Sequence, residues 1–195
     1  DEATWANFRV KTFSVAGVSA KNVTHTKISV GKPLTMPFKE PFSNGGTKQN
    51  WLRMTYGNVN AAPLVDGQAT AAEIPVYSQN GDNGYYGFNG QGAGYMLRML
   101  SLKISVTGKN PTLSLWVYKY PGADNPLDFM VNEEGSSDGW KSMKTISQAA
   151  SQNGWVREEV SLKNYIGKTI QIGWMQTTKY TSLGMVDNLS ADEKY

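Results

Sequence analysis

The residues able to do chemistry are few in this sequence, and their spacing argues against an enzyme. The chain has no cysteine, and its one histidine, His25, stands in an N-terminal segment far from any candidate nucleophile, which excludes a Ser-His-Asp triad or a zinc site. The acids in the pairs Glu133-Glu134 and Glu158-Glu159 are adjacent, so on a strand the two members of a pair point to opposite faces. Such a pair cannot flank one glycosidic bond, as glycoside hydrolysis requires. We therefore predict a protein that is not an enzyme.

Aromatic side chains are the other candidates, because flat amphipathic rings can stack on sugars. Tyr85 and Tyr86 stand between two glycine-containing turns, and adjacent strand residues face both ways, so one of these rings is expected to be exposed for ligand binding. Trp116 and Trp174 lie inside apolar stretches and are predicted to belong to the core instead.

Composition narrows the possible partners. The net charge of +3 comes from 19 basic and 16 acidic residues spread along the chain without a basic cluster, so nucleic acid is not an expected partner. No stretch of about 18 apolar residues occurs, so we expect no membrane span in this fragment. The sequence starts at Asp1 without a methionine, which suggests a piece of a longer, processed polypeptide.

Apolar residues alternate with a period of two over most of the chain, which predicts an all-β fold. Glycine-rich turns separate the alternating stretches. The strands predicted in this way include residues 100–106, 113–118, 127–131, 156–162 and 170–174. Glu158 falls on the apolar face of its strand, and only Ser142 to Ala150 shows helical periodicity, for a turn or two. A single β-sandwich is therefore expected.

Residues 1–32 have a different pattern and predict a separate β-hairpin. Two alternating stretches flank a turn, and Gly31-Lys32-Pro33 then interrupts the pattern. An isolated hairpin is marginal in water, so this one either packs on residues 33–195 or belongs to another domain. The segment from Phe8 to Ala20 resembles the last two strands of a fibronectin type III domain, which implies that residues 1–32 are the C-terminal hairpin of a truncated domain.

The remainder, 33–195, resembles the MAM-like jelly rolls of secreted Bacteroidetes proteins, including the cleaved-adhesin type of module. Four motifs carry this resemblance in the right order: Pro37 to Phe42, Leu100 to Leu115, Trp155 to Ile172, and Met185 to Leu189. The third, with its Leu-Lys-Asn-Tyr-Ile-Gly-Lys-Thr-Ile-Gln-Ile stretch, is the closest to the family pattern. The resemblance implies a jelly-roll β-sandwich preceded by a β-hairpin.

The same resemblance implies a location and a metal. It indicates an extracellular or outer cell-surface module for adhesion or binding, whose partner is a host protein, a glycan or a neighbouring domain, with loops at one end of the sandwich as the contact surface. It also implies a structural calcium near Glu40 and Asp187. Calcium needs about 6–8 oxygens, more than two side chains supply, and Asp66 and Asp82, both in glycine-rich turns, are further candidate ligands. Alternatively, Asp187 caps a turn and Glu40 is a solvated strand-edge residue.

Two other functions stay open from the sequence alone. One is a carbohydrate-binding module attached to a secreted hydrolase, which sugar binding would separate from an adhesion module. The other is an enzyme, which would need a pair of carboxyl groups facing one another across an open cleft.

Overall fold

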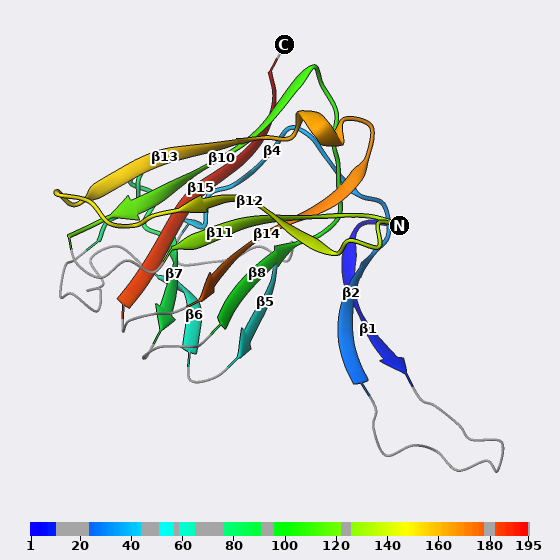
Figure 1. The fold of residues 1–195 in the computed structure, drawn as a ribbon, viewed down its shortest axis with the longest axis horizontal. Coiled ribbons are helices and arrows are strands. Elements are labelled where there is room, and N and C mark those ends of the chain that lie inside the picture. Colours follow the sequence, from blue (N-terminus) through cyan, green and yellow to red (C-terminus); the bar gives the residue numbers. More distant parts are fainter. Residues whose placement is uncertain are drawn as a thin grey trace.

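The computed structural model shows an all-β chain in which two antiparallel sheets pack face to face and a β-hairpin projects away from them (Figure 1). The residues that the structure describes are 1–10, 24–43, 51–56, 59–64, 76–90, 96–121, 126–177 and 182–194. In this part of the chain, no helix is long and apolar enough to cross a membrane. The predicted fold class, a jelly-roll β-sandwich with an N-terminal hairpin, is confirmed.

One sheet, called the β14 sheet after its central strand, has the order β12-β11-β14-β8-β5. Its strands are β5 (Trp51–Tyr56), β8 (Met96–Ser101), β11 (Leu127–Glu133), β12 (Trp140–Ile146) and β14 (Thr169–Thr177). The short strand β9 (Ile104–Ser105) extends the ladder on β14 and pairs in parallel with β3 (Leu34–Thr35). The helical turn predicted for Ser142 to Ala150 is wrong, because Ser142 to Ile146 belong to strand β12 and no helix occurs in the four residues that follow.

The other sheet, called the β15 sheet, has the order β13-β10-β15-β7-β6, with β4 also paired to β15. Its strands are β4 (Phe38–Glu40), β6 (Val59–Leu64), β7 (Tyr85–Gly90), β10 (Asn110–Lys119), β13 (Gly154–Ser161) and β15 (Ser182–Lys194). β4 and β15 are the first and last strands of this sheet along the chain, and they are neighbours, with Glu40 opposite Leu189. A short 3-10 helix (Lys163–Tyr165) joins β13 to β14.

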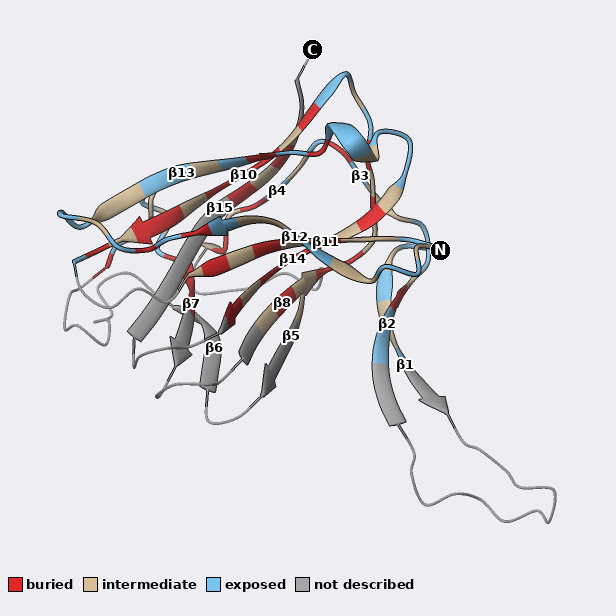
Figure 2. Cartoon of the chain, viewed as in Figure 1, coloured by how far each residue is buried: buried red, intermediate tan, exposed pale blue. Residues whose placement is uncertain are grey.

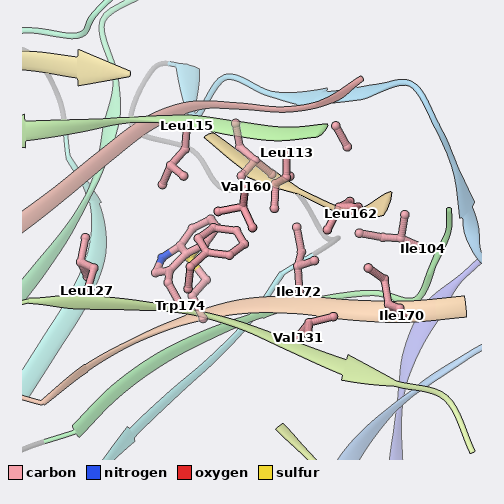
Figure 3. Close-up of a cluster of buried hydrophobic side chains, with 14 of the residues drawn as sticks. Ile104, Leu113, Leu115, Leu127, Val131, Val160, Leu162, Ile170, Ile172 and Trp174 are labelled. Carbon is pink, nitrogen blue, oxygen red and sulfur yellow. The ribbon is translucent and has the colours of Figure 1, made fainter. Parts of the chain in front are cut away.

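The core fills the space between the two sheets (Figures 2 and 3). Side chains at every second position of the central strands are buried there, as the alternation predicted. They include Ile104, Leu113, Leu115, Leu127, Phe129, Val131, Ile170, Ile172 and Trp174. Trp174 lies at the centre, with its ring centroid 5.0 Å from that of Trp51 and 6.4 Å from that of Phe42.

Two features of the core differ from the sequence prediction. The strand expected over residues 100–106 breaks at Ser101, whose buried Oγ donates to the Leu102 carbonyl and accepts the Ile172 N–H. The alternation slips there, so Leu100 lines a space on the outer face of the sheet while Leu102 is buried and Ile104 packs in the core. The second difference is Trp116, which is not a core residue: it lies half-buried on the outer face of β10.

The hairpin consists of β1 (Thr4–Val10) and β2 (Thr24–Val30). The two strands are antiparallel and pair along their whole length, from Thr4 opposite Val30 to Val10 opposite Thr24. At its base the Lys103 N–H donates to Ser29 Oγ over 3.0 Å, which connects it to the sandwich. Gly31 follows β2 and lies against the start of the chain. Its φ is +87°, and a Cβ there would lie 2.4 Å from the Glu2 carbonyl oxygen, so only glycine fits at this position. The boundary at residue 32 stays a prediction, as does the fibronectin-like origin of the hairpin, whose motif falls partly outside the described residues.

Candidate functional site

Glu40 ends β4, the first strand of the β15 sheet, and is buried, with 2% of its surface exposed. Its Oε1 accepts the Phe42 N–H at 3.1 Å, and its Oε2 accepts the indole N–H of Trp51 at 3.0 Å. The alternative of a solvated strand-edge residue is therefore wrong for Glu40. Two neutral donors hold this carboxylate in place, and each oxygen keeps a lone pair for a further ligand.

Asp82 lies in the turn before β7 and connects to the same region. Its Oδ2 accepts Ser43 Oγ–H at 2.6 Å and Asn80 Nδ2–H at 3.0 Å, while its Oδ1 is buried without a hydrogen-bond partner in the described part of the chain. Asp187 lies on β15 with its backbone opposite Trp116, two residues before the partner of Glu40. Asp66 falls outside the described residues.

Tyr85 and Tyr86 face the two sides of the β15 sheet, as their adjacent positions require, but both are buried. Tyr86 packs in the core against Phe42, with the ring centroids 5.7 Å apart. Tyr85 belongs to a second apolar cluster on the outer face of this sheet, where its ring meets Trp155 edge-on. Neither ring is exposed to a ligand, so the expectation of an exposed binding face at this pair is wrong.

A pocket on the outer face of the β14 sheet gathers residues from four strands. Gly173 of β14 forms part of its floor, and the ring of Trp140 from β12 lies over it, 3.3 Å from where a Cβ would stand. Leu100, Met130 and Met175 line the same space of about 190 Å³. The indole of Trp140 therefore packs over the glycine, and its ring forms one wall of the pocket.

Arg98 supplies the charge of this pocket. It lies on β8 opposite Met175 of β14, and its side chain lines the same space. Its Nε is buried, and in the described part of the chain it has no hydrogen-bond partner. A buried donor without an acceptor costs about 1–3 kcal/mol, so an acceptor supplied by a ligand would recover that energy.

Several other acids are held in ion pairs. Glu158 lies between Lys119 at 3.2 Å and Lys144 at 2.8 Å, and the Lys144 pair bridges edge strands of the two sheets. Burial raises the pKa of Glu158, but the hydrogen bonds from the two lysines outweigh it and lower the pKa overall. Glu133 pairs with Lys168 at 2.9 Å. These carboxylates form ion pairs within the sandwich, which is a structural role.

Comparison with known proteins agrees with this architecture. A cleaved adhesin domain of Lys-gingipain from Porphyromonas gingivalis superimposes with a TM-score of 0.61 over 82% of this chain and 99% of that domain, at 14% identity. The chain has the fold of a cleaved adhesin domain. A second such domain of Lys-gingipain gives a TM-score of 0.62 at 10% identity, again over 82% of this chain and 99% of that domain. The prediction of a cleaved-adhesin-type jelly roll is thus confirmed at the level of the fold.

Carbohydrate-binding domains have a similar fold. A xylan-binding domain from Paenibacillus barcinonensis matches with a TM-score of 0.54 over 85% of this chain and 99% of that domain, at 15% identity. No family model and no curated protein matches the sequence. The structural similarity at these identities shows the fold alone.

The sequence alone does not predict that Trp140, Gly173 and Arg98 form a binding pocket. One signal was present: Gly173 interrupts an apolar strand between Ile172 and Trp174, and a glycine inside a strand often marks the close approach of another group. What approaches it, Trp140, lies more than thirty residues earlier in the chain and becomes a neighbour only through the strand order.

Proposed function

We propose that this chain is a non-catalytic binding module of a larger extracellular bacterial protein, and that it mediates adhesion by binding a glycan or a host protein. The observation that carries this proposal is the pocket on the outer face of the β14 sheet, formed by Trp140, Gly173 and Arg98. This proposal places the contact surface on a sheet face, whereas the sequence analysis expected it at the loops at one end of the sandwich.

The pocket suits a sugar ring better than a larger group. Its volume of about 190 Å³ is below the roughly 300–1,000 Å³ of sites that enclose drug-sized ligands. The indole of Trp140 offers a flat apolar surface, and the guanidinium of Arg98 offers donors to hydroxyl or carboxylate oxygens. Two neighbours in fold are described as binding xylan and β-1,4-galactotriose, which supports a glycan as the ligand.

The absence of catalysis is also a proposal, and the pairing of the acids supports it. Glu158 is engaged by two lysines, Glu133 by Lys168 and Glu134 by Lys103. Among the described residues that line the pocket at Trp140 there is no acid. A glycosidase needs two carboxyl groups about 5–9.5 Å apart around one bond.

A glycan array followed by isothermal titration tests the proposal. We expect the wild type to bind at least one oligosaccharide, and Trp140→Ala to weaken that affinity about tenfold or more, since aromatic anchors dominate binding sites. Lys141→Ala is the matched control, because Lys141 is an exposed neighbour on β12 outside the pocket-lining residues. Equal affinity of the wild type and Trp140→Ala would remove the pocket from the proposal.

The same array distinguishes the two extracellular roles. A carbohydrate-binding module of a hydrolase should bind the polysaccharide that its enzyme degrades, whereas an adhesion module should bind glycans or proteins of a host surface. Binding to xylo- or galacto-oligosaccharides without any host glycan would favour the hydrolase module.

We also propose that calcium stabilises the fold at the junction of β4 and β15. The buried carboxylate of Glu40 and the unpartnered Oδ1 of Asp82 are hard oxygen donors of the kind that calcium prefers. Phe42 and Ser43, which hydrogen-bond to these two acids, are consecutive residues, and Asp187 lies on the strand paired with β4. Among the described residues, no three acids or histidines are grouped so that they could hold a metal ion. Backbone carbonyls would therefore complete the coordination shell of the calcium.

Melting curves with calcium and with chelator test this site. A ligand that binds only the folded state adds about 2.7 kcal/mol of stability at a hundredfold excess over Kd, so calcium should raise the Tm of stripped protein. Asp82→Asn should reduce the difference between the two curves. Asp128→Asn is the control, because Asp128 only accepts a hydrogen bond from Thr145 at the surface. Identical curves for stripped wild type with and without calcium would exclude the site.

A further inference from the structure

A second groove lies on the other side of the sandwich, on the outer face of the β15 sheet. The side chain of Trp116 lines it, and the register places Trp116 opposite Arg157 of β13. Lys39 of β4 lies opposite Ser190 of β15, so the groove extends across strands β13, β10, β15 and β4. Its volume is about 680 Å³, within the range of ligand sites.

The exposure of Trp116 contrasts with its neighbours on the same face. Residues 118 and 120 continue the outer row of β10, and both tyrosines are buried in a cluster with Val76, Tyr85 and the packed ring of Trp155. Trp155 closes this cluster by donating its indole N–H to the Tyr77 carbonyl at 2.7 Å. The cover stops before Trp116, which leaves one half-buried indole at the floor of an open groove.

A directional chain of hydrogen bonds runs along this floor. Arg157 donates to Ser114 Oγ at 3.2 Å, and Ser190 donates to Asp192 Oδ2 at 2.8 Å. The two serine hydroxyls are 2.9 Å apart, and because Ser190 gives its proton to Asp192, Ser114 must be the donor between them. Each hydroxyl has one proton and two acceptor sites, so each is left with one acceptor site. The floor therefore accepts hydrogen bonds.

Donors stand at the rim of the groove. Lys39 is exposed, and the side chain of Arg157 is 45% exposed although its guanidinium is also paired with Glu159. Acceptors on the floor and donors at the rim match a ligand whose groups both donate and accept, as sugar hydroxyls do. The positive charges of Lys39 and Arg157 are partly balanced by Asp192, so a strongly charged ligand is not required.

We infer that this groove is a second binding site, distinct from the pocket at Trp140, and that it takes a neutral oligosaccharide with one ring stacked on Trp116. The length of the groove across four strands suits a chain of sugar rings, whereas the pocket at Trp140 suits one ring. The chain would then hold glycans on both outer faces of its sandwich. This goes beyond the proposed function, which needs only the first site.

Isothermal titration with xylo-, cello-, galacto- and manno-oligosaccharides tests the inference. For at least one of them, we expect Trp116→Ala to reduce affinity about tenfold or more. Lys39→Ala should reduce the same affinity about two- to tenfold, the effect of one hydrogen bond. Lys39 is exposed, so this variant should keep the fold even if Trp116→Ala does not. Lys141→Ala is the control: Lys141 is exposed on β12, outside the residues that line this groove, and its variant should leave the affinity within about twofold of the wild type, well under one hydrogen bond. Trp140→Ala is measured beside these variants.

Two results would overturn the inference. One is that none of the four oligosaccharide series binds the wild type. The other is that binding survives both Trp116→Ala and Lys39→Ala and is lost in Trp140→Ala. This second result would leave the proposed function intact and place all glycan binding on the β14 sheet, so failure of the inference is distinguishable from failure of the proposed function.

Discussion

Replacement of Gly173 by alanine tests whether the pocket on the β14 sheet depends on the missing side chain. The new Cβ would lie 2.8 Å from the Met99 carbonyl oxygen, 2.8 Å from Leu100 Cδ2 and 3.3 Å from Trp140 Cζ3. The leucine methyl can rotate away, but the carbonyl is part of the neighbouring strand β8 and cannot move without disturbing the ladder. The added methyl also occupies the floor of the pocket.

The expected loss of stability follows from these contacts. Overpacking costs about 1–3 kcal/mol, and the lower entropy of the unfolded alanine chain returns about 0.4–1 kcal/mol. The net loss should therefore be about 1–2 kcal/mol, which for a chain of this size lowers Tm by about 2–8 °C. Urea unfolding should show a lower midpoint at an unchanged m-value. In titrations, Gly173→Ala should also weaken any ligand that Trp140→Ala weakens.

Gly154→Ala is the matched control, because Gly154 also lies in a strand but a Cβ there meets nothing within 4 Å. Its stability should be equal to or slightly above that of the wild type. If Gly173→Ala melts at the same temperature as Gly154→Ala and binds as the wild type does, the close approach of Trp140 to Gly173 is not what shapes this pocket.

Three further predictions concern stability. Trp116→Ala should lower the free energy of unfolding in urea by about 1–2 kcal/mol, because Trp116 is half-buried. This is less than the roughly 3–5 kcal/mol for removal of a buried large aromatic, and a loss of that size would show that Trp116 packs as a core residue. The pKa of Glu158 is lowered from 4.5, so its stabilisation is complete above pH 4.5 and is lost as the pH falls through the lower folded-state pKa. Glu158→Gln should thus cost about 1–2 kcal/mol at neutral pH and less at pH 3, and a pH-independent cost would contradict the ion pairs. A chain that starts at Pro33 should unfold cooperatively, and loss of that transition would show that the hairpin is integral.

The sequence predicted the parts of the fold that depend on local alternation. Leu127, Phe129 and Val131 alternate with polar residues, and all three side chains lie in the core. Trp116 was misjudged because β10 is apolar on both faces, a pattern that predicts burial on both sides. On the outer face of β10, Tyr118 is buried in the cluster with Val76, Tyr85 and Trp155, but this cluster does not include Trp116. No local sequence pattern shows where along the strand the cluster ends.

The candidate site depended more on the arrangement of the strands. The juxtaposition of Glu40 with the last strand was expected from the resemblance and is present as the pairing of β4 with β15. The pocket at Trp140 combines β8, β11, β12 and β14, which become neighbours only in the folded sheet. Its least obvious member, Arg98, lies between methionines in the sheet register, where the sequence gives no indication of a binding residue.

The pairing of β4 with β15 also determines how the sandwich responds to tension. The two strands are antiparallel, and Phe38 at the start of β4 lies opposite Ala191 near the end of β15, so the chain leaves both strands at the same edge. Once β3 has separated from β9, a pulling force on the two ends of the sandwich would therefore break the β4–β15 ladder one hydrogen bond at a time, beginning at Phe38, because its bonds do not share the load. β4 is short and would peel away before the core strands open. Its last residue is Glu40, so mechanical load on the polypeptide would be transmitted directly to the acids at this junction.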